Sequence, residues 1–209
     1  MSGRAELAYF PGSPFARMAR VLAREWSLPV DEVEVPFPPP PSLYELSPLG
    51  QVPVLSVGSE RVFPTLMVLD RLWRMAGAPT SAFTPADRQA LAVALAAGDA
   101  LVAALYQSWA GLQPVGENHV GYDPRERNLE RYERVLGWLG ERGRLRDGLT
   151  LPGVAVTCVL LWSDARGGPA WWGHGRLDRL VAGLATRPSF RQTEPQAWRP
   201  GSPGEGGTR

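Results

Sequence analysis

The chain has 209 residues, enough for one large domain or two modest ones, with the 44% hydrophobic and 21% charged content of an ordinary globular protein. Its formal net charge of +1 argues against a nucleic-acid partner or a polybasic membrane anchor. The single cysteine, Cys158, excludes an intrachain disulfide, and its apolar surroundings favour core packing. We see no signal-peptide pattern and no apolar run near the ~20 residues that cross a bilayer, so we expect a cytoplasmic protein without membrane contact.

The first predicted elements are a strand and a helix. Residues 6–10 predict the strand, which Pro11-Gly12 ends. Ser13-Pro14 opens the helix, because serine is a favourable N-cap and proline suits the first helical position. An apolar residue recurs every three or four positions and predicts the buried face: Phe15, Met18, Leu22 and Trp26. The basic residues between them predict a solvated face: Arg17, Arg20 and Arg24.

The next segments complete an α/β unit. Residues 32–35 predict a second strand, and residues 36–41 a proline-rich exposed loop. Two further strands, 52–57 and 61–63, predict a hairpin turning at Gly58-Ser59. A helix over 65–75 follows. This order of elements is that of thioredoxin, so we predict an α/β thioredoxin-like N-terminal domain over residues 1–77.

The second half of the chain is helical after a linker over 76–85. Hydrophobic periodicity predicts helices over residues 91–109, 129–139, 154–162 and 177–184. A loop over 113–124 separates the first two. The third of these is apolar all round, which predicts a helix buried on every side. We therefore expect an all-α C-terminal helical domain over 85–195 and a disordered tail over 196–209.

Three stretches of the sequence together resemble the cytosolic glutathione S-transferase superfamily. They are Tyr9 to Arg17 (YFPGSPFAR), Leu46 to Leu55 (LSPLGQVPVL) and Arg187 to Pro195 (RPSFRQTEP). The last is similar to a C-terminal signature of bacterial members. The resemblance implies the glutathione transferase fold, glutathione as co-substrate, and a homodimer formed through the N-terminal domain and the long helices.

The resemblance implies a residue that stabilises the glutathione thiolate. Ser13 lies where serine-type members place this group, and a hydroxyl at a helix N-terminus suits an anion. Lowering a thiol pKa from ~8.5 toward neutrality raises the reactive fraction. Tyr9 lies where tyrosine-type members place a phenol and is the alternative. Ser13 could instead serve only as an N-cap, and Tyr9 only as a strand residue beneath the helix.

Further residues match the glutathione-binding positions of the superfamily. Val52-Pro53 matches a cis-proline dipeptide whose preceding residue pairs with the cysteinyl backbone of glutathione. Gln51 matches a position that can contact the glycine carboxylate. Thr65 retains a hydroxyl and a helix N-terminal amide for the γ-glutamyl carboxylate, next to Pro64.

Pro64 is a departure from the pattern, since the superfamily usually has an acid there that binds the α-amino group. A charged hydrogen bond contributes about 1.5–3 kcal/mol, so its loss predicts roughly ten- to hundredfold weaker binding. Asp99 offers a substitute across a dimer interface, as in some members, or is an exposed helix charge.

The second substrate is expected between the two domains. Candidate contacts are aromatic or apolar, as suits a hydrophobic electrophile: Phe10, Pro11, Tyr106 and Trp109. Tyr106 and Trp109 could equally be core of the helical domain. We thus predict a detoxifying glutathione transferase without a metal, and keep two alternatives: a non-catalytic relative, and a glutathione-dependent isomerase or lyase.

Overall fold

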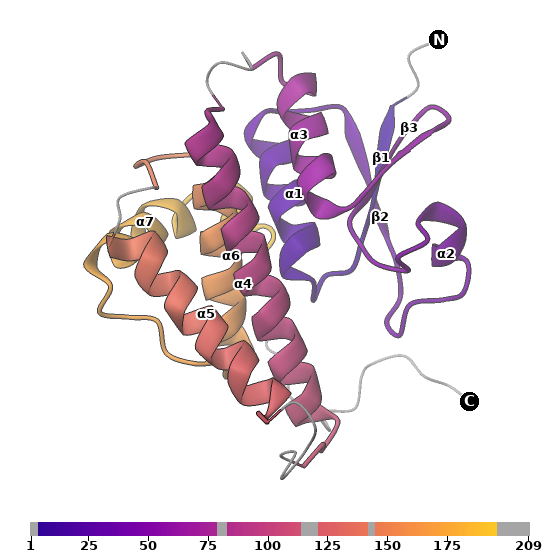
Figure 1. Cartoon of the computed structure of the whole chain (residues 1–209). Coiled ribbons are helices and arrows are strands. Elements are labelled where there is room, and N and C mark those ends of the chain that lie inside the picture. The colour runs from indigo at the N-terminus through magenta and orange to yellow at the C-terminus, as the bar shows by residue number, and fades with distance from the viewer. Residues whose placement is uncertain (1–3, 79–82, 114–120, 142–144, 196–209) are drawn as a thin grey trace.

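The computed structural model describes residues 4–78, 83–113, 121–141 and 145–195. The predicted tail over 196–209 lies outside the described residues, as do parts of the predicted linker and of the predicted loop, 79–82 and 114–120. A small sheet with its own helices lies beside a bundle of longer helices (Figure 1).

The sheet has four strands among the described residues: β1 (Ala5–Tyr9), β2 (Val30–Glu34), β3 (Val54–Val57) and β4 (Glu60–Val62). Their spatial order is β2-β1-β3-β4, with β1 parallel to β2 and antiparallel to β3. The hairpin of β3 and β4 is confirmed, with Leu55 opposite Val62. This mixed sheet confirms the thioredoxin-like N-terminal part.

Three helices accompany the sheet: α1 (Pro14–Glu25), α2 (Leu43–Leu46) and α3 (Thr65–Met75). Successive strand residues point to opposite faces of a sheet, so Leu7 and Ala8 belong to different cores. Leu7 packs in the large core with α1 and α3, and Ala8 packs in a small one with Leu43 of α2. Figure 1 shows α1 and α3 between the sheet and the long helices.

The helical part consists of α4 (Pro85–Trp109), α5 (Pro124–Glu141), α6 (Leu151–Ala165), α7 (Gly175–Ala185) and the short α8 (Pro188–Arg191). Thr84 and Asp87 form a capping box that starts α4, through a 3.2 Å bond from the Asp87 amide to Thr84 Oγ1 and a 2.9 Å bond from the Thr84 amide to Asp87 Oδ2. This helix packs against α5 and α6.

Helix α4 is long and apolar enough to cross a membrane by length and composition, with a mean hydropathy of 1.6, which the sequence analysis did not expect. Its apolar character comes from many alanines interrupted by polar residues rather than from one contiguous run. Half of its most apolar stretch is buried inside the protein, as expected of a core helix.

Helix α6 is buried on every side over most of its length, as its composition predicts. Cys158 on this helix is fully buried, and burial raises the pKa of its thiol to about 12. A thiol that stays protonated at neutral pH is a poor nucleophile, so core packing is confirmed for Cys158.

The arginine side of α1 is not solvated, and this prediction was wrong. Arg17 is only 3% exposed, and its guanidinium donates to the Phe190 carbonyl at 3.0 Å. Arg20 and Arg24 both pair with Glu32 on β2, the former at 2.8 Å. Segments distant in sequence cover this side of the helix, and a periodicity within one helix carries no information about them.

Candidate functional site

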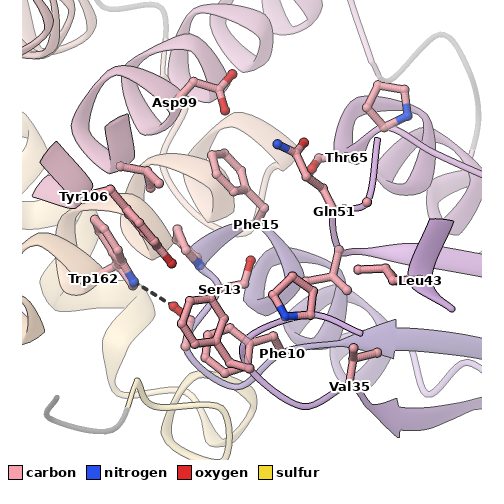
Figure 2. A pocket seen from close by; sticks show the side chains of 18 of the residues that line it. Phe10, Ser13, Phe15, Val35, Leu43, Gln51, Thr65, Asp99, Tyr106 and Trp162 are labelled. Carbon is pink, nitrogen blue, oxygen red and sulfur yellow. Dashed lines mark hydrogen bonds between the residues drawn. The ribbon is translucent and has the colours of Figure 1, made fainter. Parts of the chain in front are cut away.

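A cavity of about 750 Å³ lies between the sheet domain and the helices. One wall comes from the loops and helix N-termini of the sheet domain, and the other from α4 and α6 (Figure 2). Its volume is in the range of small-molecule sites. Most of its lining is apolar, and a few polar side chains lie among the apolar ones: Ser13, Gln51, Thr65 and Asp99.

Ser13 lies in the cavity at the N-terminus of α1 (Figure 2). Its Oγ accepts a hydrogen bond from the Ala16 amide at 3.2 Å, which confirms the predicted N-cap. Because Oγ is the acceptor in this bond, the hydroxyl proton can be donated to a ligand atom. The hydroxyl and the helix N-terminus therefore present positive potential to the same point of the cavity.

Gly12, just before Ser13, is held by the helical domain. Trp162 Nε1 on α6 donates to the Gly12 carbonyl at 2.8 Å (Figure 2). A Cβ at Gly12 would lie 2.5 Å from Phe10 Cε1 and 3.2 Å from Arg166 Nη2, so any larger residue here would displace the Phe10 ring. The position of Ser13 thus depends on α6 as well as on its own helix.

The loop before β3 and the start of α3 form the next part of this wall. Gln51, Val52, Pro64 and Thr65 all line the cavity. The Val52-Pro53 peptide is cis, as predicted, and Pro53 is buried behind the wall rather than lining it. Thr65 is the first residue of α3, with Pro64 as an N-cap that makes no side-chain capping bond. A second helix N-terminus therefore opens into the same cavity as that of α1.

Aromatic side chains gather at the other end of the cavity. Phe10 and Phe37 stack with ring centroids 4.9 Å apart, and Tyr106 on α4 meets Phe37 edge-on at 6.5 Å. The ring centroid of Trp109 lies 5.1 Å from that of Tyr106 and 6.0 Å from that of Trp162. Trp109 itself does not line the cavity. Flat apolar ligands fit such a wall.

Comparisons with known proteins agree with this geometry. The sequence model of the glutathione S-transferase N-terminal domain matches residues 12–68, a range that includes Ser13, Gln51 and Thr65. No curated protein matches the chain significantly. A solved glutathione S-transferase from Methylobacillus flagellatus with glutathione bound is 26% identical, with a TM-score of 0.76, over 91% of this chain and 99% of the other.

Two further solved structures share the fold. A glutathione S-transferase from Methylobacterium radiotolerans in complex with glutathione sulfonate is 23% identical over 94% of this chain and 97% of its own, with a TM-score of 0.77. A glutathione transferase family member from Pseudomonas fluorescens with bound glutathione is 22% identical over 91% and 98%, with a TM-score of 0.74. The N-terminal part of this chain therefore matches the glutathione S-transferase family model, and the chain as a whole shares the fold of these glutathione S-transferases.

Within the glutathione S-transferase fold, Tyr9 and Ser13 have different surroundings. Tyr9 is absent from the cavity lining; its hydroxyl donates to Glu34 at 3.1 Å, and the Arg20 guanidinium lies 4.1 Å from its ring centroid. Burial raises the pKa of the Tyr9 phenol, and Arg20 opposes this rise. Ser13 faces the cavity and Tyr9 faces β2.

The predicted contacts of the second substrate lie partly in the cavity of this glutathione S-transferase fold. Phe10 and Tyr106 line it, whereas Pro11 and Trp109 do not. Phe37 and Trp162 also line the cavity, and neither was among the predicted contacts. Phe37 is 50% exposed in the loop predicted from its prolines, and a lone aromatic residue within that run was the available signal. The sequence held no signal for Trp162 as a cavity contact, because it lies in a uniformly apolar helix.

We find no candidate metal site in the described part of the chain. No group of three or more His, Cys, Asp or Glu side chains able to hold a metal occurs in residues 4–78, 83–113, 121–141 and 145–195. The described residues that line the cavity offer hydroxyls, one carboxylate, a side-chain amide and aromatic rings.

Proposed function

We propose that this protein is a glutathione S-transferase that joins the thiol of glutathione to a hydrophobic electrophile. One observation carries the proposal: the N-termini of α1 and α3, with Ser13 and Thr65, open into the same cavity. Helix N-termini favour anions, and glutathione offers an anion for each of them, a thiolate and the γ-glutamyl carboxylate. Glutathione bound in two of the relatives with solved structures supports this assignment.

Ser13 is the proposed catalytic residue. Its hydroxyl donates to the thiolate while Oγ accepts from the Ala16 amide, so the thiolate is stabilised without disturbing the helix cap. The thiolate then attacks the electrophile, forming a carbon–sulfur bond as the leaving group departs with its electron pair. Holding both substrates in one cavity adds the advantage of proximity.

Thr65 with the α3 N-terminus is proposed to bind the γ-glutamyl carboxylate, Val52 the cysteinyl backbone, and Gln51 the glycine carboxylate. Tyr106 and Phe10 are proposed to contact the electrophile, together with Phe37. We assign residues 1–77 to the glutathione-binding domain and 85–195 to the helical domain, in a cytoplasmic homodimer with a detoxifying role.

A non-catalytic binding protein is the second candidate, and Pro64 favours it. At the start of α3 Pro64 supplies no acid to the α-amino group of glutathione. Weak glutathione binding without turnover would fit a carrier or regulatory protein of the same fold.

Calorimetric titration with reduced glutathione tests the proposal. We expect binding at micromolar to millimolar strength, weakened about ten- to hundredfold in Thr65→Ala by loss of a hydrogen bond to a charged group. Thr186→Ala, at the exposed end of α7, is the matched control and should bind as the wild type does. Absence of binding at several millimolar would overturn the proposal, and binding without turnover of a chlorodinitrobenzene would favour the second candidate.

A further inference from the structure

A cationic side chain lies at the rim of the cavity, at its aromatic end. Arg166 is the C-cap of α6, about one helical turn after Trp162, which lines the cavity. Its guanidinium carbon lies 5.9 Å from the Trp162 ring centroid, and its Nη2 lies 3.2 Å from the position that a Cβ would take on Gly12. Because Gly12 also lines the cavity, the side chain turns back from the end of α6 toward the loop before Ser13.

Tyr106 faces the same end of the cavity from α4, and Figure 2 shows it there with Trp162 and Phe10. Burial raises the pKa of the Tyr106 phenol, and the Arg166 guanidinium opposes this rise, so the two groups are close enough to interact. Burial also lowers the pKa of Arg166, which nevertheless stays protonated at neutral pH. A partly buried cation gains more from an anion than one in bulk water does, because the local dielectric is lower.

The acids near this region lie in other directions. Asp164, two residues before Arg166 on α6, accepts a hydrogen bond from Trp171 Nε1 at 2.9 Å. Asp99 is the only charged residue among the described residues that line the cavity, and it lies about two helical turns before Tyr106 on α4. An anionic group on a ligand that packs against Phe10 and Tyr106 is therefore attracted to the rim at Arg166 and repelled from Asp99.

We propose that Arg166 binds an anionic group on the electrophile, so that the second substrate is an acidic aromatic compound such as a substituted benzoate. This inference rests on the proposed function, because it names the class of the second substrate. A guanidinium has five N–H donors in a planar fork that matches a carboxylate. Arg166 can therefore hold a carboxylate while it keeps its 3.5 Å contact with the Ala165 carbonyl.

The first experiment measures the binding of two unreactive ligands of nearly the same shape, 3-nitrobenzoate and 3-nitrobenzamide, by calorimetry without glutathione. The wild type should bind the carboxylate about tenfold more tightly, since hydrogen bonds between charged groups are stronger than neutral ones. Arg166→Gln should remove this preference and leave the affinity for the amide unchanged. Arg179→Gln, at an exposed position on α7, is the matched control and should keep the preference.

Arg166→Met is the second variant, in case Arg166→Gln does not fold. Its unbranched side chain can still pack on Trp162, and it should lose the preference in the same way. The inference is overturned if the wild type shows no preference for the carboxylate or if the preference survives in either variant. An equal loss of affinity for both ligands would mean that Arg166 only shapes the wall, and would overturn the inference as well.

The second experiment compares turnover of 4-chloro-3-nitrobenzoate and 4-chloro-3-nitrobenzamide with glutathione. The thiolate sulfur forms a bond to the ring carbon, and the chlorine leaves with its electron pair as chloride. Arg166→Gln should raise KM for the benzoate about tenfold and leave kcat/KM for the benzamide unchanged. A fall in kcat/KM for the benzamide, with its pH profile shifted to higher pH, would mean that Arg166 acts on the thiolate instead and would overturn the inference.

The two experiments also separate this inference from the proposed function. A nitrobenzoate preference that depends on Arg166, in a protein that does not bind glutathione, would sink the proposed function alone. Turnover of a chlorodinitrobenzene without that preference would sink the inference alone.

Discussion

The N-terminal domain meets the helical domain in two regions of opposite character. In the closed contact, α1 packs directly on α6 and α8, with Met18, Cys158 and Phe190 buried between them. Even a charged residue there has protein partners, since Arg17 donates to the Phe190 carbonyl. In the cavity, Ser13, Thr65 and Asp99 face open space instead.

This difference separates stability from binding. Buried polar groups without hydrogen bonds destabilise the fold, and in the closed contact Arg17 finds protein partners for Nε and Nη2, although its Nη1 has none among the described residues. Polar groups around a cavity can be satisfied by a ligand. Substitutions in the closed contact should therefore change the free energy of unfolding, and substitutions in the cavity should change binding or turnover.

Ser13→Ala should have the largest effect of the changes considered, and it should fall mainly on turnover. Removing a hydroxyl that donates to a thiolate is expected to lower kcat/KM about ten- to hundredfold, corresponding to about 1.5–3 kcal/mol. The measurement is conjugation of glutathione to chlorodinitrobenzene across pH 6 to 9. Loss of thiolate stabilisation should shift the rise of kcat/KM to higher pH, since a larger share of the thiol stays protonated.

Ser13→Thr is the control, because it keeps both the hydroxyl and the N-cap. Loss of the cap alone costs about 0.5–2 kcal/mol of stability, which urea unfolding of Ser13→Ala measures separately. An unchanged pH profile in Ser13→Ala would mean that Ser13 acts only as the N-cap of α1. Its substitution would then change stability alone, as in the closed contact.

Glu25 provides the corresponding test of the closed contact. Its carboxylate, whose side chain is 8% exposed, accepts two hydrogen bonds from Arg187, at 2.7 and 2.6 Å, and a further one from Ser189. The hydrogen bond from Arg187 lowers the pKa of Glu25 below its ordinary value of 4.5, burial opposes this, and Ser189 lowers it further. Since Arg187 is 43% exposed, solvent weakens the pair. We expect Glu25→Gln to lose about 1–2 kcal/mol of unfolding free energy at pH 7.

The pH dependence follows from the sign of this shift. A depressed folded pKa contributes stability in full above the unfolded value, and the contribution disappears as pH falls through the folded value. The difference between the wild type and Glu25→Gln in urea unfolding should thus shrink from pH 7 to pH 3. Asp31→Asn removes an exposed pair with Arg4 and should cost under about 0.5 kcal/mol. A constant difference between the wild type and Glu25→Gln over this range would contradict the assignment.

The same division separates what the sequence could predict from what it could not. Ser13 as N-cap, the cis Val52-Pro53 peptide and the start of α3 at Thr65 are local features, fixed by residues a few positions apart. All three are confirmed as structural features, and all lie at or beside the N-terminal wall of the cavity. The order of strands and helices follows in the same way from local patterns.

Contacts between distant segments could not be predicted in this way. The spacing of Arg17 along α1 is that of a solvated face. The structure instead buries Arg17 against α8, where its partner Phe190 lies 173 residues later in the chain. Phe37 and Trp162 likewise reach the cavity through tertiary packing. Sequence patterns describe which face of a helix is apolar, whereas the partner of each face depends on the whole fold.

Trp162→Phe should give the smallest effect, and it tests the boundary between the two regions. Trp162 belongs to α6 in the closed contact, but its ring lines the cavity and its Nε1 donates to the Gly12 carbonyl at 2.8 Å. Phenylalanine retains an aromatic face and loses this bond, so we expect a loss of about 0.5–1.5 kcal/mol of unfolding free energy. Because the bond also positions the loop before Ser13, kcat/KM should fall a few-fold. Trp172→Phe, at a 63% exposed position, is the control and should change neither quantity. A loss of stability in Trp162→Phe with unchanged kcat/KM would mean that Ser13 is positioned by its own helix alone, and the two regions would then be independent.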